Sequence, residues 1–294
     1  MICGWRMDVE ELGPDRLKRM WHEVDAGLLS AEEFYREQDR LLAGYRDLWE
    51  GAILFGGCSD LSLSVLVELS AYLGDPDLEG IRRRCLLALS DVGREWGEKV
   101  GNLCEQTVEQ FYDRSEAMIY ELMWWHSLAE DLSPLAYVVA LKLAAQRGCR
   151  DHLDFGSGVG SGGLLFARHG FHVTLADVSS RGLELSKWRF QQRELEARHI
   201  DLRTEGLPEG EFDFVTAMDV FEHLVDPVRA VEKLSRAMRK GGILFGRFFA
   251  EADEARPHHI VLDFGPTLRA LEGSGFVRIW KDEWLWGHEA YRKS

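Results

Sequence analysis

Apolar positions follow two different rhythms along this chain, and the change falls near residue 130. From residue 14 to about residue 129 they recur every three or four residues and are interrupted by glycines or capping residues, which predicts helices. Ser30 to Glu33 has the pattern of a capping box, Asp60 can cap the next helix, and Pro76 is expected in the first turn of another. This part predicts four or five packed helices and no strand.

Strand and helix signals alternate after Ser133 and Pro134, which mark the start of a helix. Seven segments carry strand patterns: 151–155, 172–177, 197–202, 212–218, 243–249, 276–282 and 283–293. Helical segments separate the first six, which favours a mostly parallel sheet, whereas the last two are too close for a crossover and predict an antiparallel hairpin. We therefore predict an all-α domain over residues 1–130 and an α/β domain with a seven-stranded sheet over residues 131–294.

Charge and composition restrict the classes of partner. Hydrophobic residues make up 46% of the chain and charged residues 29%, as in an ordinary globular protein. The net charge is −15, and most of the acidic excess lies in the first half. Such a surface repels phosphate backbones and anionic lipids, so we expect neither nucleic acid nor membrane as a partner.

The cysteines and the apolar runs indicate the cellular compartment in which the protein is expected. The five cysteines are scattered singly, a pattern that predicts reduced thiols: Cys3, Cys58, Cys85, Cys104 and Cys149. No leader pattern follows Met1, and no apolar run approaches the ~18 residues that a membrane helix needs. A cytoplasmic protein is expected.

A glycine-rich segment, LDFGSGVGSGG (153–163), follows the first predicted strand and precedes a helix. Glycines there permit a tight turn and the close approach of a ligand to the backbone. Asp177 ends the next predicted strand, where a carboxylate can bind the hydroxyls of a ribose. Gly158, Gly160 and Gly163 also fit the spacing of NAD-binding proteins. The alternatives are a tight turn without ligand and a simple helix cap by Asp177.

Four segments carry a resemblance to a known family: LDFGSGVG, LADVS, LPEGEFDFVTAMDVFEHLVDP and MRKGGILF. In order and spacing they resemble the class I S-adenosylmethionine-dependent methyltransferases, and most of all small-molecule methylases of the ubiquinone O-methyltransferase type. The likeness covers roughly residues 130–294, and the preceding residues resemble no family that we identify. It implies a Rossmann-like methyltransferase fold, S-adenosylmethionine as methyl donor, and a small-molecule acceptor methylated on oxygen or nitrogen.

The resemblance also implies which residues bind the methionine part of the cofactor. These follow the first predicted strand: Gly156, Ser157, Gly158 and Gly160. Asp154 would support this loop from below. Asp219, at the end of the fourth predicted strand, would lie beside the methionine end of the cofactor and the transferable methyl group.

The ribose and the adenine are assigned in the same way. The resemblance implies that Asp177 holds the ribose and that Val178 touches the adenine. The family binds the adenine amino group with a polar residue after the third strand, and Asp201 is the candidate here. This chain departs from the family at that point, because Arg203 or Thr204 occupies the usual position.

Polar side chains after the fourth and fifth predicted strands supply the candidate chemistry. Methyl transfer from a sulfonium needs an aligned acceptor, and a base helps when the acceptor is a hydroxyl. Glu222, His223, His258 and His259 are the candidates, with one histidine as general base, although Glu222 and His223 can simply brace their loop. Asp219, Glu222, His223 and His258 or His259 can also bind a divalent metal, since carboxylates and imidazoles suit Mg, Mn or Zn.

Aromatic residues gather in the segment 109–131, just before the α/β part. Tyr112, Tyr120 and Trp125 can cover the cofactor and face its sulfonium through cation–π contact. Their helical spacing is equally typical of a core stripe. For residues 14–108, a substrate-shaping cap, a surface for a homodimer and a separate binding module all remain open.

Two further functions are compatible with the sequence. A methyltransferase fold can bind the cofactor or a partner protein without turnover, because fold does not fix function. An NAD-dependent oxidoreductase would use the alternative glycine spacing, but the segment 212–227 and the terminal strand pair count against it. The prediction is an enzyme that methylates a small molecule.

Overall fold

The computed structural model describes residues 11–294, and the first part of this range is helical. Six helices precede the sheet there: α1 (Gly13–Asp25), α2 (Ala31–Ile53), α3 (Leu61–Leu73), α4 (Leu78–Lys99), α5 (Glu105–Arg114) and α6 (Ala117–Trp125). The prediction of four or five helices was too low, because Ser115, with an extended ψ of 125°, separates α5 from α6. Residues 11–130 contain no strand, as predicted.

Two of the three predicted helix starts have the capping residue that the sequence indicated. Ser30 and Glu33 exchange the two hydrogen bonds of a capping box, and Asp60 accepts a hydrogen bond from the first turn of α3. Both predictions are confirmed. The start of α4 differs, because the N-cap is Asp77 and not a residue before Pro76. The Asp77 carboxylate accepts from the third amide of the helix and so fixes the start beyond the proline.

Seven strands form one sheet: β1 (Asp151–Phe155), β2 (His172–Asp177), β3 (Arg198–Asp201), β4 (Phe212–Ala217), β5 (Met238–Gly246), β6 (Phe276–Lys281) and β7 (Glu289–Lys293). Their order is β3-β2-β1-β4-β5-β7-β6. The first five are parallel, while β7 runs antiparallel to both β5 and β6. The predicted mostly parallel sheet with an antiparallel end is confirmed.

The last strand is shorter than predicted. It begins at Glu289 and not at residue 283. The Asp282 carboxylate accepts hydrogen bonds from the backbone amides of Trp284, Leu285 and Trp286, which folds this stretch into a turn. Those amides are consequently not available to a strand ladder.

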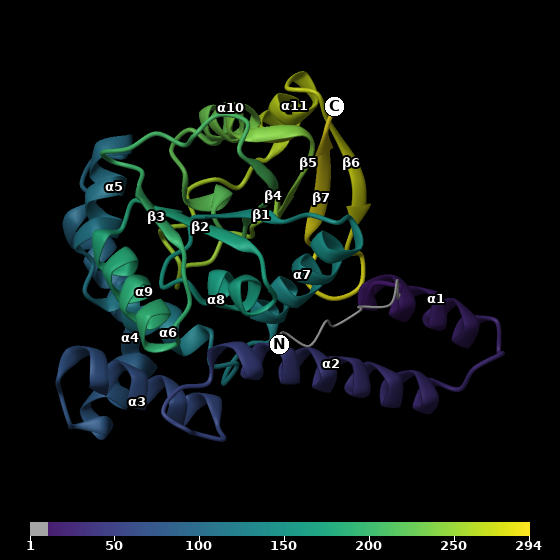
Figure 1. Ribbon diagram of the computed structural model, residues 1–294, viewed down its shortest axis with the longest axis horizontal. Coiled ribbons are helices and arrows are strands. Elements are labelled where there is room, and N and C mark those ends of the chain that lie inside the picture. The colour runs from purple at the N-terminus through teal and green to yellow at the C-terminus, as the bar shows by residue number, and fades with distance from the viewer. Residues whose placement is uncertain (1–10) are drawn as a thin grey trace.

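Helices cover both faces of the sheet (Figure 1). One face carries α7 (Ala136–Gln146), α8 (Ser161–Arg168) and α9 (Ser180–Gln192), and the other carries α10 (Pro227–Ala237) and α11 (Gly265–Gly273). Two 3-10 helices complete the fold: η1 (Ser133–Leu135) and η2 (Phe221–His223). In such a sheet, loops at the carboxyl ends of the parallel strands form the ligand crevice.

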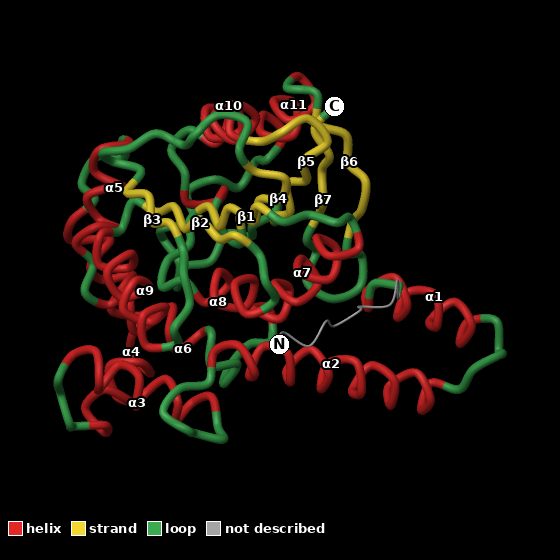
Figure 2. The backbone as a smooth tube through the Cα atoms, viewed as in Figure 1, coloured by secondary structure: helices red, strands yellow, loops and turns green. Residues whose placement is uncertain are grey.

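The helical part and the sheet share one hydrophobic core. Trp49 of α2 is fully buried among residues that include Tyr137 of α7 and Phe166 of α8. Farther out, α1 and the start of α2 project as an arm beside the β6–β7 end of the sheet, as Figure 2 shows. The indole Nε1 of Trp280 donates to Asp15 of this arm at 2.9 Å. The helical part is thus packed against the sheet at several places.

Two expectations from the sequence concern membrane-spanning helices and the cysteine thiols. No helix in residues 11–294 is long and apolar enough to cross a membrane. Cys58, Cys85, Cys104 and Cys149 are free thiols, as expected. Cys3 and the residues around Met1, on which the leader prediction rests, lie outside the described residues.

Candidate active site

A cavity of about 340 Å³ lies at the carboxyl ends of β1, β2, β4 and β5, under helices α5 and α6. Most of the candidate residues line it together: Tyr112, Trp125, Gly156, Ser157, Gly158, Asp177, Val178, Asp219, Glu222, His223, His258 and His259. They come from six segments that are far apart in the sequence. The parallel strands bring four of these segments together, because each strand delivers its following loop to the same edge of the sheet. Helices α5 and α6 contribute the other two, with Tyr112 and Trp125.

The glycine loop after β1 has a backbone that only glycine adopts easily. Gly156 has a φ of +73°, and a Cβ added there would lie 2.5 Å from Val220 Cγ2. Gly158 has a φ of +49°, and its added Cβ would lie 2.7 Å from Leu122 of α6. Gly163, which completed the NAD-like spacing, packs its bare Cα against Leu175 of β2. That glycine serves contact between helix and strand.

Asp177 holds the glycine loop in place from the end of β2. One carboxylate oxygen accepts from the amide of Gly158 and the other from the amide of Ser179, both at 2.7 Å. Burial raises the pKa of Asp177, while these amide hydrogen bonds oppose the rise. A helix-capping role belongs to Ser179, whose hydroxyl accepts from Gly182 at the start of α9. Asp177 therefore has free lone pairs that face the cavity.

Asp154 and Gly160 lie beneath the loop and do not line the cavity. Asp154 is fully buried and accepts hydrogen bonds from Thr216 Oγ1 at 2.8 Å and from the Tyr137 hydroxyl at 3.2 Å. Burial raises the pKa of Asp154 to about 7. Gly160, with a φ of +78°, is the N-cap of α8. The position of Asp154 is compatible with the supporting role that the resemblance implied. Gly160, which was expected to bind the methionine part of the cofactor, does not line the cavity, because its positive φ starts α8 and its Cα packs against Ser186.

Tyr120 and Asp201 are not brought to the cavity. Tyr120 is buried between α4 and α6, and its hydroxyl accepts from Arg84 at 2.9 Å. Asp201 is bound by the guanidinium of Arg203, with the Arg203 Nη2 to Asp201 Oδ2 distance at 2.7 Å. The hydrogen bond from Arg203 is the largest influence that lowers the pKa of Asp201. Arg203, where the sequence departs from the family pattern, thus pairs with the Asp201 carboxylate that was expected to bind the adenine.

The turn after β4 places two acidic groups in the cavity wall. Asp219 has a φ of +49°, and its carboxylate lies 3.2 Å from Arg247 Nε. Glu222 is 1% exposed, and neither of its carboxylate oxygens has a hydrogen-bond partner among the described residues. Burial, and then the negative charge of Asp219, raises the pKa of Glu222 to about 8. A buried carboxyl without a partner is costly, which makes Glu222 a candidate for contact with a ligand.

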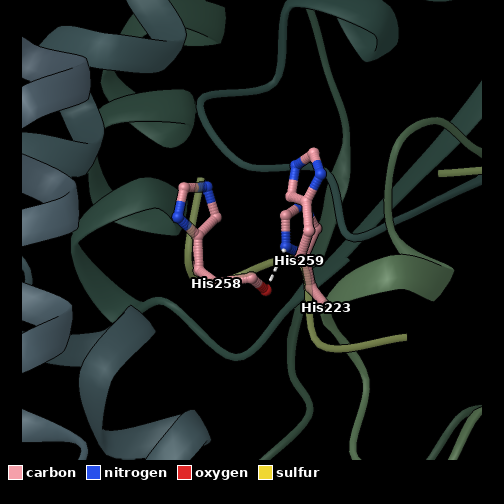
Figure 3. Close-up of side chains that lie close together, drawn as sticks. All are labelled: His223, His258 and His259. Carbon is pink, nitrogen blue, oxygen red and sulfur yellow. Dashed lines mark hydrogen bonds between the residues drawn. The ribbon is translucent and has the colours of Figure 1, made fainter. Parts of the chain in front are cut away.

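Three histidines lie close together, as Figure 3 shows: His223 of η2 and His258 and His259 of the loop after β5. One nitrogen from each of His223, His258 and His259 lies within 4.8 Å of the others. His223 Nδ1 donates to the backbone carbonyl of His258 at 3.0 Å, which leaves Nε2 of His223 as its lone-pair nitrogen. Burial lowers the pKa of all three, to about 3 in His258. The cluster is therefore neutral at pH 7, the state in which imidazole binds a metal.

The helices above the cavity supply its aromatic wall. Tyr112 of α5 packs edge-on against His223, and its buried hydroxyl has no hydrogen-bond partner within residues 11–294. Trp125 of α6 lines the cavity and donates from Nε1 to Asp131 and Ser133, both at 3.2 Å. An aromatic wall in this place suits a cationic or aromatic ligand.

Several cavity residues were not predicted from the sequence. Among them are Glu121, His126, Arg247 and Arg256. Burial raises the pKa of Glu121 to about 7 and lowers that of His126 to about 3. Position relative to the strands offered a signal for Arg247, which follows β5 directly. Glu121 lies on α6, His126 follows that helix directly, and Arg256 lies on the loop after β5. Sequence spacing at these positions does not indicate which way a side chain points.

The residues present fit S-adenosylmethionine. Gly156 and Gly158 line the cavity with positive φ, and the close packing of Val220 and Leu122 against them leaves no space for side chains, so the loop presents its backbone to the cavity. Ser157 Oγ is buried without a partner, as is the Tyr112 hydroxyl, when only the described part of the chain is considered. Such unpaired groups are expected where a polar ligand binds.

Comparison with known proteins gives matches in the same part of the chain. A family model described as a methyltransferase domain matches residues 153–246. The ubiquinone biosynthesis O-methyltransferase of Alkalilimnicola ehrlichii is 34% identical over 131 residues, which cover 40% of this chain and 51% of that protein. The protein of the same name from Coxiella burnetii is 30% identical over 152 residues, covering 47% and 62%. The chain thus spans about half to three fifths of the length of these relatives.

A solved structure shows the same fold. Magnesium protoporphyrin IX methyltransferase from Synechocystis PCC 6803, with S-adenosylmethionine bound, has a TM-score of 0.50 and is 17% identical. The match covers 66% of this chain and 99% of that one. The family match includes the glycine loop after Leu153, Asp177 and the Glu222-His223 pair. The chain therefore carries, over residues 153–246, a methyltransferase domain of the class I S-adenosylmethionine-dependent family.

Proposed function

We propose that this chain is an enzyme that transfers a methyl group from S-adenosylmethionine to an oxygen or nitrogen of a small molecule. One observation carries the proposal: the glycine loop, Asp177 and the polar group of Glu222 with three histidines all line one cavity. A cofactor against the loop would place its reactive end between the loop and that polar group. The similarity to O-methyltransferases of ubiquinone biosynthesis supports an acceptor of small-molecule type.

The residues of the chain would divide the work by position. S-Adenosylmethionine, when bound, supplies an electrophilic methyl group. The loop amides and Asp177 would hold the donor, and Tyr112 and Trp125 would exclude water from above. His223 or His259 would accept a proton from a hydroxyl acceptor, since both imidazoles are neutral at pH 7. Alignment of donor and acceptor provides much of the rate in such a displacement.

The first prediction concerns Asp177. Asp177→Ala removes the carboxylate that holds the Gly158 amide and faces the cavity, so we expect S-adenosylhomocysteine to bind at least about tenfold more weakly, a loss of ~1.4 kcal/mol. Isothermal titration of wild type and variant with S-adenosylmethionine, S-adenosylhomocysteine and NAD measures this. Tight NAD binding without response to the methyl-donor compounds would overturn the proposal. Donor binding with no turnover across a panel of phenols and amines favours the non-catalytic alternative.

We further propose a divalent metal beside Glu222. His223, His258 and His259 supply three imidazole nitrogens within 4.8 Å of one another. Asp219 and Glu222, which were expected to join these ligands, line the same cavity but lie outside the group of ligand atoms that the described residues bring within 4.8 Å of one another. Their carboxylates would add negative charge to the surroundings of a cation. A metal bound there would supply a Lewis acid for a hydroxyl acceptor and would take the place of a free histidine base, because a ligating imidazole nitrogen no longer accepts a proton. The sequence predicted either His258 or His259 as a ligand, and both lie in the group with His223.

The second prediction tests this metal. Because the pKa of Glu222 is about 8, its carboxyl is mostly protonated at pH 7 and must release a proton when a cation binds. We expect Mn²⁺ or Zn²⁺ to raise the melting temperature of the wild type with proton release, and Glu222→Gln to abolish the release and most of the shift. His22→Gln, at an exposed histidine of α1, is the matched control. Full activity after exhaustive chelation, with no metal found by elemental analysis, refutes the proposal.

The role of the helical part is proposed on the same basis. We propose that residues 1–130 form a domain whose last helices, α5 and α6, shape the acceptor side of the cavity. The support is that both helices contribute cavity residues, among them Tyr112 and Trp125. A homodimer through this part and a cytoplasmic location stay predictions.

A further inference from the structure

A charged group is buried between the helical part and the methyltransferase domain. Glu68 of α3 and Arg189 of α9 are fully buried, and Arg193, just after α9, is 8% exposed. Arg189 Nε lies 3.1 Å from Glu68 Oε1, and Arg189 Nη2 lies 3.3 Å from Glu68 Oε2. Arg193 forms a second ion pair with Glu68 Oε1 and donates to the backbone carbonyl of Ile53 at the end of α2. One carboxylate thus faces two arginines.

Arg189 also reaches the cofactor loop. Its Nη1 donates to the backbone carbonyl of Val159 at 2.8 Å and to Ser161 Oγ at 2.7 Å. Val159 lies within the glycine loop and lines the cavity, and Ser161 is the first residue of α8. The planar guanidinium therefore uses one edge for Glu68 and one corner for the loop.

The chemistry of this group depends on both parts of the chain. Burial is the largest influence on both charged groups: it acts to raise the pKa of Glu68 and lowers that of Arg189. The charges of the two arginines outweigh burial at Glu68, so its pKa lies below the usual range. A buried charge that loses its partner is strongly disfavoured. Arg189 can remain at the loop as a cation only while Glu68 lies beside it.

We propose that Glu68 and Arg189 are positioning residues for the glycine loop, so that a helix outside the matched methyltransferase segment sets the affinity for the cofactor. The inference takes the identity of the ligand from the proposed function, whereas the contacts of Glu68 and Arg189 do not depend on which ligand binds. Helix α3 precedes residue 153, where the family match begins, so Glu68 lies outside the matched segment. The helical part then contributes to donor binding as well as to the acceptor side.

Three full-length variants test this proposal. Ser161→Ala removes one loop contact and leaves every buried charge paired. Glu68→Gln removes the counter-charge of Arg189. Arg189→Lys keeps a cation but loses the planar fork that reaches Glu68 and the loop together. The matched control is Asp282→Asn, since Asp282 is an equally buried carboxylate in the turn before β7 and does not line the cavity.

Two measurements are made at a temperature at which circular dichroism shows that each variant is folded. Titration with S-adenosylhomocysteine is expected to show about tenfold weaker binding for Glu68→Gln and Arg189→Lys, a weaker effect of the same sign for Ser161→Ala, and none for the control. Hydrogen exchange of the ligand-free protein is expected to show faster exchange of the amides of residues 156–161 in the three variants only.

The outcomes separate the two proposals. If the wild type does not bind S-adenosylhomocysteine, the proposed function fails, while loop exchange still decides whether Glu68 and Arg189 order the loop. Folded variants with unchanged affinity and unchanged loop exchange overturn the inference. An equal loss of affinity in Asp282→Asn also overturns it, because the effect would then be general loss of stability.

Discussion

At the scale of single residues, the cavity depends on positions where a side chain is either absent or unpaired. Gly156 and Gly158 adopt a positive φ in places where a side chain would collide with Val220 or Leu122, and Glu222 presents a carboxyl without a partner among the described residues. The buried carboxyl is unfavourable in an empty protein, because burial without a hydrogen bond costs free energy. The occurrence of these features around one cavity is what a binding site predicts.

The third prediction follows from the loop. Gly156→Ala introduces a Cβ 2.5 Å from Val220 at a φ of +73°, so the loop must move. We expect S-adenosylhomocysteine to bind about tenfold more weakly or worse, since strain of this kind costs about 1–3 kcal/mol. Gly170→Ala is the control, because φ there is +80° but no atom lies within 4 Å. Titration calorimetry distinguishes them, and equal affinity in both would show that the loop does not carry the cofactor.

At the scale of elements, α2 fastens the helical part to the domain that holds the loop. Trp49 of α2 is fully buried, donates from Nε1 to the His126 carbonyl at 3.0 Å, and stacks on Tyr137 of α7. Tyr137 in turn donates to Asp154 beneath the loop. Packing thus connects α2, α6 and α7 to the first strand.

The fourth prediction tests this connection. Trp49→Phe removes the indole N–H and part of the ring, leaving a carbonyl without its partner and a small void. We expect the free energy of unfolding to fall by about 2 kcal/mol. The matched control is Trp284→Phe, since Trp284 is only partly buried and should cost less than ~1 kcal/mol. Urea denaturation provides both values, and equal losses would contradict a special role for α2.

At the scale of the whole molecule, several imidazoles are buried without charge. Burial lowers the pKa of His126, His152 and His288 to about 3. Because the folded pKa lies below the unfolded value of 6.5, the unfolded chain binds more protons between pH 6.5 and pH 3. The stability contributed by keeping these rings neutral is therefore present above pH 6.5 and is lost progressively as the pH falls toward 3.

The fifth prediction isolates one of these rings. His288 is 1% exposed, stacks on Phe245, and neither ring nitrogen has a partner in the described range. His288→Phe should remove its share of the acid destabilisation, about 2 kcal/mol between pH 8 and pH 5. Urea unfolding of wild type and variant at both pH values measures the difference. An unchanged pH dependence in the variant would show that His288 is protonated in the folded protein.

Some of the site could be predicted from the sequence because its signals are local. The loop glycines follow a strand directly, and Asp177 ends the next strand, so the parallel sheet alone places them together. His126 and Glu121 could not be predicted in this way. Glu121 lies on α6 and His126 is the C-cap of that helix, so whether they face the cavity depends on how the helix packs over the loop. Tyr120, one residue before Glu121, faces α4 instead.

Strand periodicity and glycine spacing act over short distances, so the amino-acid sequence was enough to predict the α/β sheet, its antiparallel end and the glycine loop. The motifs within residues 153–246 were enough to indicate the family. The division of the chain at residue 130 stays a prediction. Tertiary structure alone decided that α2 and α3 join the core of the methyltransferase domain and that Glu68 meets Arg189 behind the loop. Those contacts join residues more than a hundred positions apart, and only packing of the complete chain brings such residues together.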